Sequence, residues 1–402
     1  MSETRAQELY PQCDIDLFAP DALKDPFPLY KTIRDLGPVV WLSRVGAAAI
    51  SRFEDVQMAL RSADALISGE GIGFNRIANH QTAERGVLTS DGERHQKLRS
   101  VLARPLGPGA LRERREMLKS LIDAQVASLV GGETFDAVPA LARHLPLKAV
   151  TALVGLDEEG RAKMLDWAAA FFNTLAPIPE NDADFSPALR ADLDLLRDLR
   201  DFFAGVDPDC LAPGSWSADL FNAVGEGRLT ESEARGALRA FVIPSLDTTI
   251  YAKANLLFNL ARHKEQWRRL KEDRSLISSA IIESVRHSAV VRAFSRFAAE
   301  DYSADNVFLK KGTRVMVMFG SANRDERRYK NPDAFDVARN PRDQLGWGTG
   351  PHMCVGMHLA KLEMELLLEA LLDNVEAIEA DAPEFGVNAG LYGIDRLPMR
   401  LR

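Results

Sequence analysis

The segment from Gly346 to Gly356, GWGTGPHMCVG, holds the densest group of residues that could do chemistry. Its glycines bracket an aromatic residue, His352 and Cys354, directly before a stretch with helical spacing. Glycine lets the backbone turn sharply and approach a flat ligand closely. A cysteine that enters a helix N-terminus is favoured as the thiolate by the free backbone amides and the helix dipole. A charged sulfur of this kind is what a thiolate ligand to iron requires.

Three other interpretations of this segment stay open from its residues alone. It could be a glycine-rich turn around a buried structural cysteine. It could be a dinucleotide-binding loop, but the third glycine of a GxGxxG pattern would fall on Pro351. It could hold a cysteine nucleophile, for which His352 lies too near in sequence to be a good base.

Two further patterns place charged residues on one face of a predicted helix. Glu283 and Arg286 lie three residues apart and can pair, as many residues on exposed helix faces do. His95 and Arg99 lie four residues apart, a spacing that also fits a solvated helix face. An arginine in such a pair can bind a carboxylate with both arms of its guanidinium.

Together these motifs resemble the cytochrome P-450 superfamily. Its cysteine-ligand signature is an aromatic residue followed by GxGxHxCxG, and the chain matches it from Trp347 to Gly356, with Trp347 where phenylalanine is usual. The resemblance runs from roughly residue 15 to the end of the chain. It implies a heme b cofactor near Trp347, with Cys354 as the iron ligand. It implies a structural triad near the heme of Glu283, Arg286 and Arg339. It implies that the heme propionates are bound by His95, Arg99, Arg296 and His352.

The segment Phe241–Ile250, FVIPSLDTTI, resembles the oxygen-activation motif of that family, in which an acid and a threonine follow a pair of small residues. Asp247 and Thr248 match the acid and the threonine. Cleavage of O2, the expected co-substrate, needs protons delivered into a dry pocket, and this pair could relay them. The plain alternative is an Asp-Thr pair on a helix surface. Pro244 and Ser245 replace the small pair, and proline inside a helix predicts a kink.

The resemblance implies a monooxygenase that inserts one oxygen atom into a small hydrophobic or aromatic substrate, by hydroxylation or O-demethylation. The substrate pocket is expected to be apolar. By alignment it would draw on Ile72, Phe74, Phe171, Phe172, Ile243, Val291, Phe294 and Leu391. Taken singly, each of these residues is more often ordinary core than a ligand contact.

The resemblance to bacterial members also implies partners. Electrons are expected from a separate iron–sulfur ferredoxin and its NAD(P)H-dependent reductase, through a small and salt-sensitive contact. Two alternatives stay open. One is a peroxide-using or non-oxygenating heme enzyme of the same fold, which Pro244 keeps possible. The other is a heme-binding sensor without turnover.

The elements that must position these residues are mainly helical. Apolar residues recur with helical spacing over 112–130, 188–203, 229–262, 276–287 and 355–374. Thr230 and Glu233 form a capping-box pattern at the start of the longest of these stretches. Strand signals appear in a predicted hairpin over 38–53 and again over 314–319 and 397–401. The segments 66–91 and 329–351 look irregular, and loops of that length are usually functional.

The whole chain predicts a mainly α protein with small β-sheets at both ends of the sequence, folded as one large domain over residues 1–402. No linker, repeat or low-complexity tract divides it. The 46% of hydrophobic residues can bury a large core around a cofactor.

Composition also excludes several functions. A net charge of −8 argues against nucleic acid as a partner, because phosphate binding needs a basic surface. No apolar run approaches the about 20 residues of a membrane span. Three widely spaced cysteines exclude a cysteine-rich zinc or iron–sulfur site and indicate a reducing, cytoplasmic location.

Overall fold

The computed structural model describes residues 9–80 and 85–402. The predicted hairpin is confirmed: β2 (Val39–Leu42) pairs antiparallel with β3 (Ala47–Ile50). The turn between them contains Gly46 at a φ of +70°, a left-handed conformation that glycine adopts without steric cost. All eight strand residues are buried, so the hairpin is part of the core.

The hairpin belongs to a six-stranded sheet with the order β1-β2-β3-β9-β6-β4. Its other strands are β1 (Gln12–Cys13), β4 (Leu66–Ile67), β6 (Phe294–Ala298) and β9 (Arg314–Val317). Strand β9 pairs parallel with β3, which joins segments more than 260 residues apart in the sequence. The expectation of a mainly helical protein with small sheets is confirmed, and this sheet combines strands from residues 12–67 with strands from residues 294–317.

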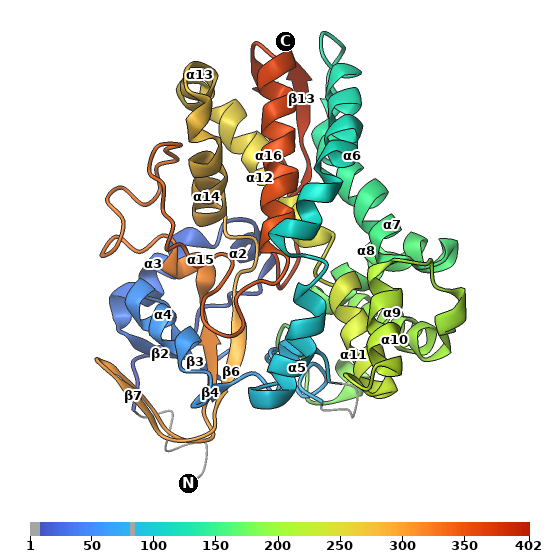
Figure 1. The fold of residues 1–402 in the computed structure, drawn as a ribbon. Coiled ribbons are helices and arrows are strands. Elements are labelled where there is room, and N and C mark those ends of the chain that lie inside the picture. Colours follow the sequence, from blue (N-terminus) through green and yellow to red (C-terminus); the bar gives the residue numbers. More distant parts are fainter. Residues whose placement is uncertain (1–8, 81–84) are drawn as a thin grey trace.

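Helices make up most of the remaining structure (Figure 1). In chain order they are α2 (Pro20–Lys24), α3 (Phe27–Leu36), α4 (Phe53–Arg61), α5 (Gly92–Ala103), α6 (Pro108–Ala127), α7 (Thr151–Val154), α8 (Glu158–Asn173), α9 (Pro187–Gly205), α10 (Trp216–Gly225), α11 (Glu231–Val242), α12 (Asp247–Arg262), α13 (Lys264–Glu272), α14 (Ile277–His287), α15 (Phe319–Ala322) and α16 (Met357–Asn374). The remaining strands are β5 (Phe135–Asp136), β7 (Tyr302–Ala304), β8 (Val307–Leu309), β10 (Ile378–Ala380), β11 (Glu384–Phe385), β12 (Ile394–Arg396) and β13 (Pro398–Leu401).

The stretch 229–262, expected as one helix, forms two. Its start is as predicted, because Thr230 and Glu233 make both hydrogen bonds of a capping box at the N-terminus of α11. Helix α11 ends at Val242, residues 243–246 form a turn, and α12 begins at Asp247. Proline lacks an N–H and clashes with the preceding turn, so Pro244 accounts for an interruption here rather than a mere kink.

Helix α16 runs through the middle of the helical region beside α6 (Figure 1). Its residues Leu366, Leu367 and Leu371 are completely buried in the main hydrophobic core, which also receives side chains from α12 and α14. Because α16 follows Cys354 directly, this packing anchors the cysteine loop on a rigid element.

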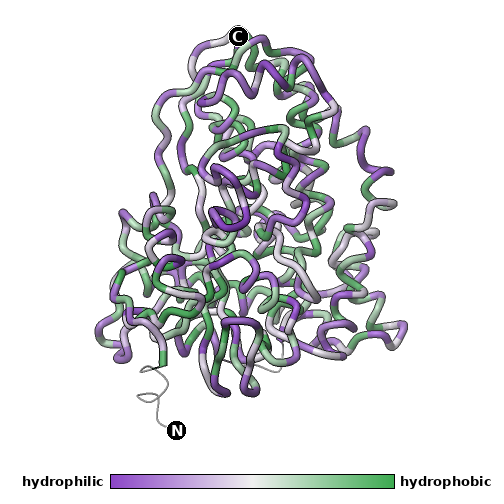
Figure 2. Tube along the Cα trace, turned by 90° about the vertical axis from the view of Figure 1, so that its left-hand side faces the viewer, coloured by the Kyte–Doolittle hydropathy of each residue, from purple (hydrophilic) through white to green (hydrophobic). Residues whose placement is uncertain are grey.

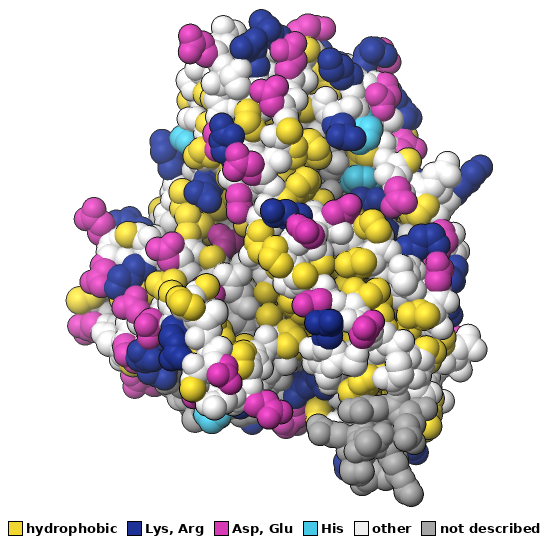
Figure 3. Space-filling view, turned by 180° about the vertical axis from the view of Figure 1, so that it is seen from behind, with side chains coloured by type: hydrophobic (Ala, Val, Ile, Leu, Met, Phe, Trp, Pro, Cys, Tyr) yellow, Lys and Arg dark blue, Asp and Glu magenta, His cyan; other side chains and the backbone are white. Residues whose placement is uncertain are grey.

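Apolar and polar stretches alternate along the chain trace, as Figure 2 shows. Within the described residues, no helix is long and apolar enough to cross a membrane. On the face in Figure 3, acidic and basic side chains are interspersed, and apolar side chains gather near the middle.

The two segments expected to be irregular are largely so. Residues 66–91 contain only β4 and a short 3₁₀ turn, with residues 81–84 outside the described part. Residues 329–351 contain no helix or strand.

Candidate functional site

The loop before α16 is closed by backbone hydrogen bonds. The N–H of Cys354 donates to the carbonyl of Trp347 at 2.8 Å, and the N–H of Met353 donates to Gly350 at 3.1 Å. Gly350 has a φ of +71°, and a Cβ there would lie only 2.5 Å from the carbonyl oxygen of Leu60. Only glycine fits this position, so the loop can pack tightly on the end of α4.

This loop presents the sulfur of Cys354 as a possible ligand. Cys354 is exposed, yet enough protein surrounds the sulfur for lost hydration to raise the thiol pKa. The N–H groups of Gly356 and Met357 and the charge of Arg99 act in the opposite direction and lower that pKa. A bound cation on the open side would add to these groups and favour the thiolate.

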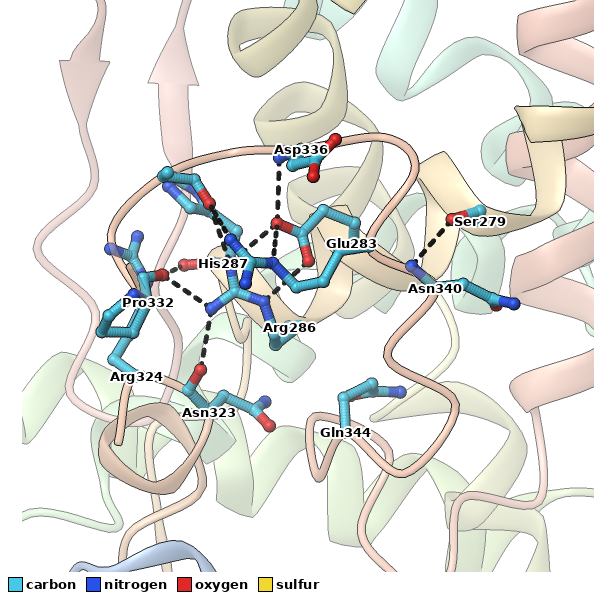
Figure 4. A network of polar contacts seen from close by, with 12 residues as sticks. Ser279, Glu283, Arg286, His287, Asn323, Arg324, Pro332, Asp336, Asn340 and Gln344 are labelled. Atoms are coloured by element: carbon cyan, nitrogen blue, oxygen red, sulfur yellow. Dashed lines mark hydrogen bonds and ion pairs between the residues drawn. The ribbon is translucent and has the colours of Figure 1, made fainter. Parts of the chain in front are cut away.

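A buried ion-pair network positions the loop (Figure 4). Glu283 and Arg286 are fully buried on α14 and make two hydrogen bonds, Nε to Oε2 at 2.7 Å and Nη2 to Oε1 at 2.8 Å. Arg339 adds a third contact, from its Nε to Oε1 of Glu283 at 3.2 Å. The three side chains that the sequence predicted as a triad thus lie together. The Glu283–Arg286 pair is buried and does not lie on a solvated helix face.

The network extends to the chain that leads into the cysteine loop. Arg286 donates to the carbonyls of Asn323 at 2.9 Å and Pro332 at 2.7 Å. The side-chain oxygen of Asn323 in turn accepts from the N–H of Leu345 at 2.7 Å, one residue before the loop. Helix α14 therefore holds the loop through a short series of hydrogen bonds.

Four side chains predicted to bind carboxylates come from three separate segments: His95 and Arg99 from α5, Arg296 from β6 and His352 from the cysteine loop. The rings of His95, on α5, and His352 lie 4.2 Å apart. Nε2 of His95 is buried without a hydrogen-bond partner. Arg296, on β6, is only 3% exposed, and the neighbouring Ser295 carbonyl is its one acceptor among residues 9–80 and 85–402. Arg99 donates to the carbonyl of Met353 at 2.5 Å, beside Cys354.

The positive charge of Arg296 and the unpaired ring nitrogen of His95 favour an anionic ligand. Burial lowers the pKa of Arg296 to about 10, and Asp91 partly offsets that effect. At neutral pH the guanidinium stays charged, and no ion-pair partner for it exists among the described residues. A buried, unpaired guanidinium and an unpaired imidazole nitrogen fit the two propionate carboxylates of a heme.

Asp91 is a site residue that the sequence analysis missed. Its carboxylate accepts from the N–H groups of Ser68 at 3.0 Å and Gly69 at 2.5 Å, and it lies 3.4 Å from Nε2 of His352. It thereby ties the start of the 66–91 loop to the histidine of the cysteine loop. The sequence signal that could have identified Asp91 is its position four residues before His95, directly before a helix.

Asp247 and Thr248 lie in the first turn of α12. Burial raises the pKa of Asp247 to about 7, against the lowering effect of Arg143. The hydroxyl of Thr248 donates to the carbonyl of Pro244 at 2.7 Å, and that of Ser245 donates to Val242 at 3.2 Å. Asp247 is therefore poised to gain or lose a proton near neutral pH, next to a hydroxyl.

The structure brings most of the expected pocket residues together. One apolar cluster contains Ile72, Phe171, Phe172, Ile243, Val291, Phe294 and Leu391. Phe74 lies beside it, lining a small cavity with Leu175 and Gly390. The cluster draws on the 66–91 loop, α8, the α11–α12 turn, strand β6 and the segments around Val291 and Leu391, so residues far apart in sequence share one apolar region.

A sequence profile of the cytochrome P-450 family matches residues 216–384. Cytochrome p450 CYP199A2 of Rhodopseudomonas palustris is 32% identical over 399 residues, which cover 97% of this chain and 94% of that protein. The ligand-free structure of CYP164A2 from Mycobacterium smegmatis superimposes with a TM-score of 0.84 at 28% identity, over 96% and 98% of the two chains. CYP109E1 from Bacillus megaterium, solved with testosterone, shares the fold with a TM-score of 0.85 at 22% identity, over 96% and 100% of the two chains.

Proposed function

Because this chain belongs to the cytochrome P-450 family, whose members are heme-dependent oxidoreductases with a cysteine thiolate ligand and O2 as co-substrate, we propose that it hydroxylates or O-demethylates a small hydrophobic or aromatic substrate. We take residues 1–402 as one domain for this reaction. The cytoplasmic location predicted from the cysteines remains a prediction.

The observation that supports this proposal best is that the loop of Cys354 meets the predicted propionate ligands: its His352 packs on the ring of His95, and Arg99 donates to its Met353 carbonyl. When bound, heme supplies the redox chemistry that activates O2. Cys354 would hold the iron, and its thiolate would be supported by the amides of Gly356 and Met357. His95, Arg99, Arg296 and His352 would hold the propionates, because His95 and Arg296 have buried donors that meet no anionic partner in the described part of the chain.

On the opposite side of the pocket, Asp247 and Thr248 would deliver protons. A carboxyl group with a pKa of about 7 can take a proton from water and pass it inward at neutral pH. Thr248 would pass it on through its hydroxyl, which needs only to rotate away from the Pro244 carbonyl.

The apolar cluster around Phe172 and Leu391 supports the proposed substrate class. Its members supply aromatic and aliphatic surface, and they bury an apolar ligand better than a polar one. The regions that contribute them include the 66–91 loop, which carries Ile72 and Phe74.

Electrons would come from an iron–sulfur ferredoxin with an NAD(P)H-dependent reductase. A surface hollow of about 540 Å³ opens beside the cysteine loop, and Trp347 and Met353 line it. Arg61, Arg342 and Lys361 line the same hollow with one carboxylate, Asp343, so it offers a net positive charge to an acidic partner close to Cys354.

A peroxide-using or non-oxygenating reaction is the second candidate. The observation in its favour is the interrupted helix at Pro244, with the hydroxyls of Ser245 and Thr248 bonded to backbone carbonyls. If these bonds persist during turnover, the proton relay would be bypassed.

The test begins with a screen of small aromatic and aliphatic compounds for a shift of the heme Soret band. Each binder is then incubated with ferredoxin, reductase and NADH, and separately with hydrogen peroxide. Product only with the electron-transfer proteins supports the monooxygenase. Efficient product formation with peroxide alone supports the second candidate, and binding without product in either assay supports a sensor.

A further inference from the structure

Arg143 lies in an unusual stretch of backbone that packs against α12. Two π-helical segments, η2 (Val138–Ala142) and η3 (Pro146–Val150), flank it. Segments of this kind are rare and occur often at functional sites. Segment η2 packs on α12, the helix that begins with Asp247.

Arg143 and Asp247 are both short of partners. Nε of Arg143 is buried without a hydrogen-bond partner, and no carboxylate in the described part of the chain lies within ion-pair distance of this guanidinium. Asp247 likewise accepts no hydrogen bond from any described residue. An unpaired cation and an unpaired acid on packed elements act on each other through space, and both residues are partly buried.

The other charges around Asp247 are carboxylates from two further elements that pack on α12. Asp395 comes from β12 and Asp166 from α8, and both are exposed to solvent. Asp395 is held in place by Tyr251, one helical turn after Asp247, whose hydroxyl donates to Oδ1 at 2.7 Å. The ring of Tyr251 packs so closely on Gly393 that a Cβ there would lie 2.1 Å from its Cγ.

Tyr251 therefore acts as a fixed support. Burial raises its pKa far above neutrality, so the phenol stays a neutral donor to Asp395. The environment of Asp247 thus contains two carboxylates that disfavour its ionised form and one guanidinium that favours it. The three charges reach Asp247 from three different elements.

We propose that Arg143 is a positioning residue for the oxygen reaction: its charge sets how readily Asp247 takes up and releases a proton, against the opposing carboxylate that Tyr251 fixes at Asp395. This inference rests on the proposed relay role of Asp247. It assigns to the surface around η2, β12 and α8 the solvent end of the proton path.

The proposal predicts pH shifts of opposite sign. Only a protonated Asp247 can donate, so product formed per NADH should fall as pH rises through about 7. Arg143→Gln removes the charge that favours ionisation, so this fall should move up by about one pH unit. Asp395→Asn removes an opposing charge, so the fall should move down, by up to about one unit.

The experiment measures product per NADH from pH 5.5 to pH 9, about the range on either side of the expected fall, with ferredoxin and reductase held constant. Arg143→Lys keeps the charge and should restore the wild-type profile. Arg161→Gln, an exposed position on α8, is the control that should leave the profile unmoved. Asp395→Asn changes an exposed residue, and the new side chain can still accept a hydrogen bond from Tyr251. This variant therefore tests the proposal even if Arg143→Gln does not fold.

The outcomes distinguish an error about the role of Arg143 from an error about the relay role of Asp247. If Asp247→Asn removes the fall but Arg143→Gln and Asp395→Asn leave it at the wild-type pH, or shift it in the same direction, the role of Arg143 is wrong and the relay stands. If Asp247→Asn leaves both coupling and profile at wild-type values, the relay itself is wrong.

Discussion

Arg296 presents a buried charge that no carboxylate of the described residues pairs. It is 3% exposed, and within that part of the chain it bonds only to the carbonyl of Ser295. Arg296→Ala should lower heme retention strongly, because a propionate would lose its buried cation. The heme-to-protein ratio after gel filtration measures this loss. Arg314→Ala on the adjacent strand, whose side chain donates to Gly71 and Glu70 carbonyls, is the control and should retain heme. Equal heme content in both variants would contradict the propionate assignment.

Thr248 is the second residue for which a single substitution tests the proposed function. Thr248→Ala should leave substrate binding intact and divert electrons to hydrogen peroxide, because protons would no longer reach the reacting oxygen in order. Product and peroxide per NADH measure the diversion. Thr248→Ser keeps a hydroxyl and should stay coupled. Wild-type coupling in Thr248→Ala would show that protons arrive by another route, such as the Ser245 hydroxyl.

The sequence predicted individual site residues better than it predicted which residues contact them in the folded chain. Glu283, Arg286 and Arg339 were named from motifs, and the structure brings them together. Asp91 was missed because a single aspartate before a helix is common, and its link to His352 exists only after the chain folds. The environment of Asp247 was equally hidden, since Arg143 and Asp395 lie far away in sequence.

At the scale of elements, α14 anchors the cysteine loop through Arg286. All of its polar hydrogens are used by Glu283 and three backbone carbonyls. Arg286→Gln leaves Glu283 buried and poorly paired, which should cost about 3–5 kcal/mol of unfolding free energy. Denaturant unfolding of the holoprotein measures it.

The control for this prediction is Arg197→Gln on α9. Arg197 pairs with Asp194 at the same three-residue spacing, but both side chains are more than 60% exposed. An exposed pair of this kind contributes about 1 kcal/mol or less. Equal destabilisation of the two variants would refute the anchoring role of α14.

Helix periodicity could locate the elements but not the interruption at 243–246. Apolar spacing continues through Pro244, and the capping box at Thr230 marks only the start. Whether a proline kinks or breaks a helix depends on what packs against it. Here η2, α8 and β12 pack on the second half, α12, and support its separate direction.

At the scale of the whole molecule, the fold joins strands from residues 12–67 and residues 294–317 in one sheet. Strand β9 joins the N-terminal hairpin in a single sheet, a pairing that the sequence analysis did not predict. Such pairing has no local sequence signal, because it is set by the packing of distant segments. The mainly α class was predictable, since helix periodicity is local.

The central claim is that Cys354 is the thiolate ligand of a heme. The most direct measurement is the absorption spectrum of the reduced, carbon monoxide-bound protein, in which a thiolate-ligated heme has a strongly red-shifted Soret band. Wild type, Cys13→Ser and Cys210→Ser should all show this band, and Cys354→Ser should lose it. A red-shifted band that persists in Cys354→Ser, or that disappears in Cys13→Ser or Cys210→Ser instead, would contradict the account.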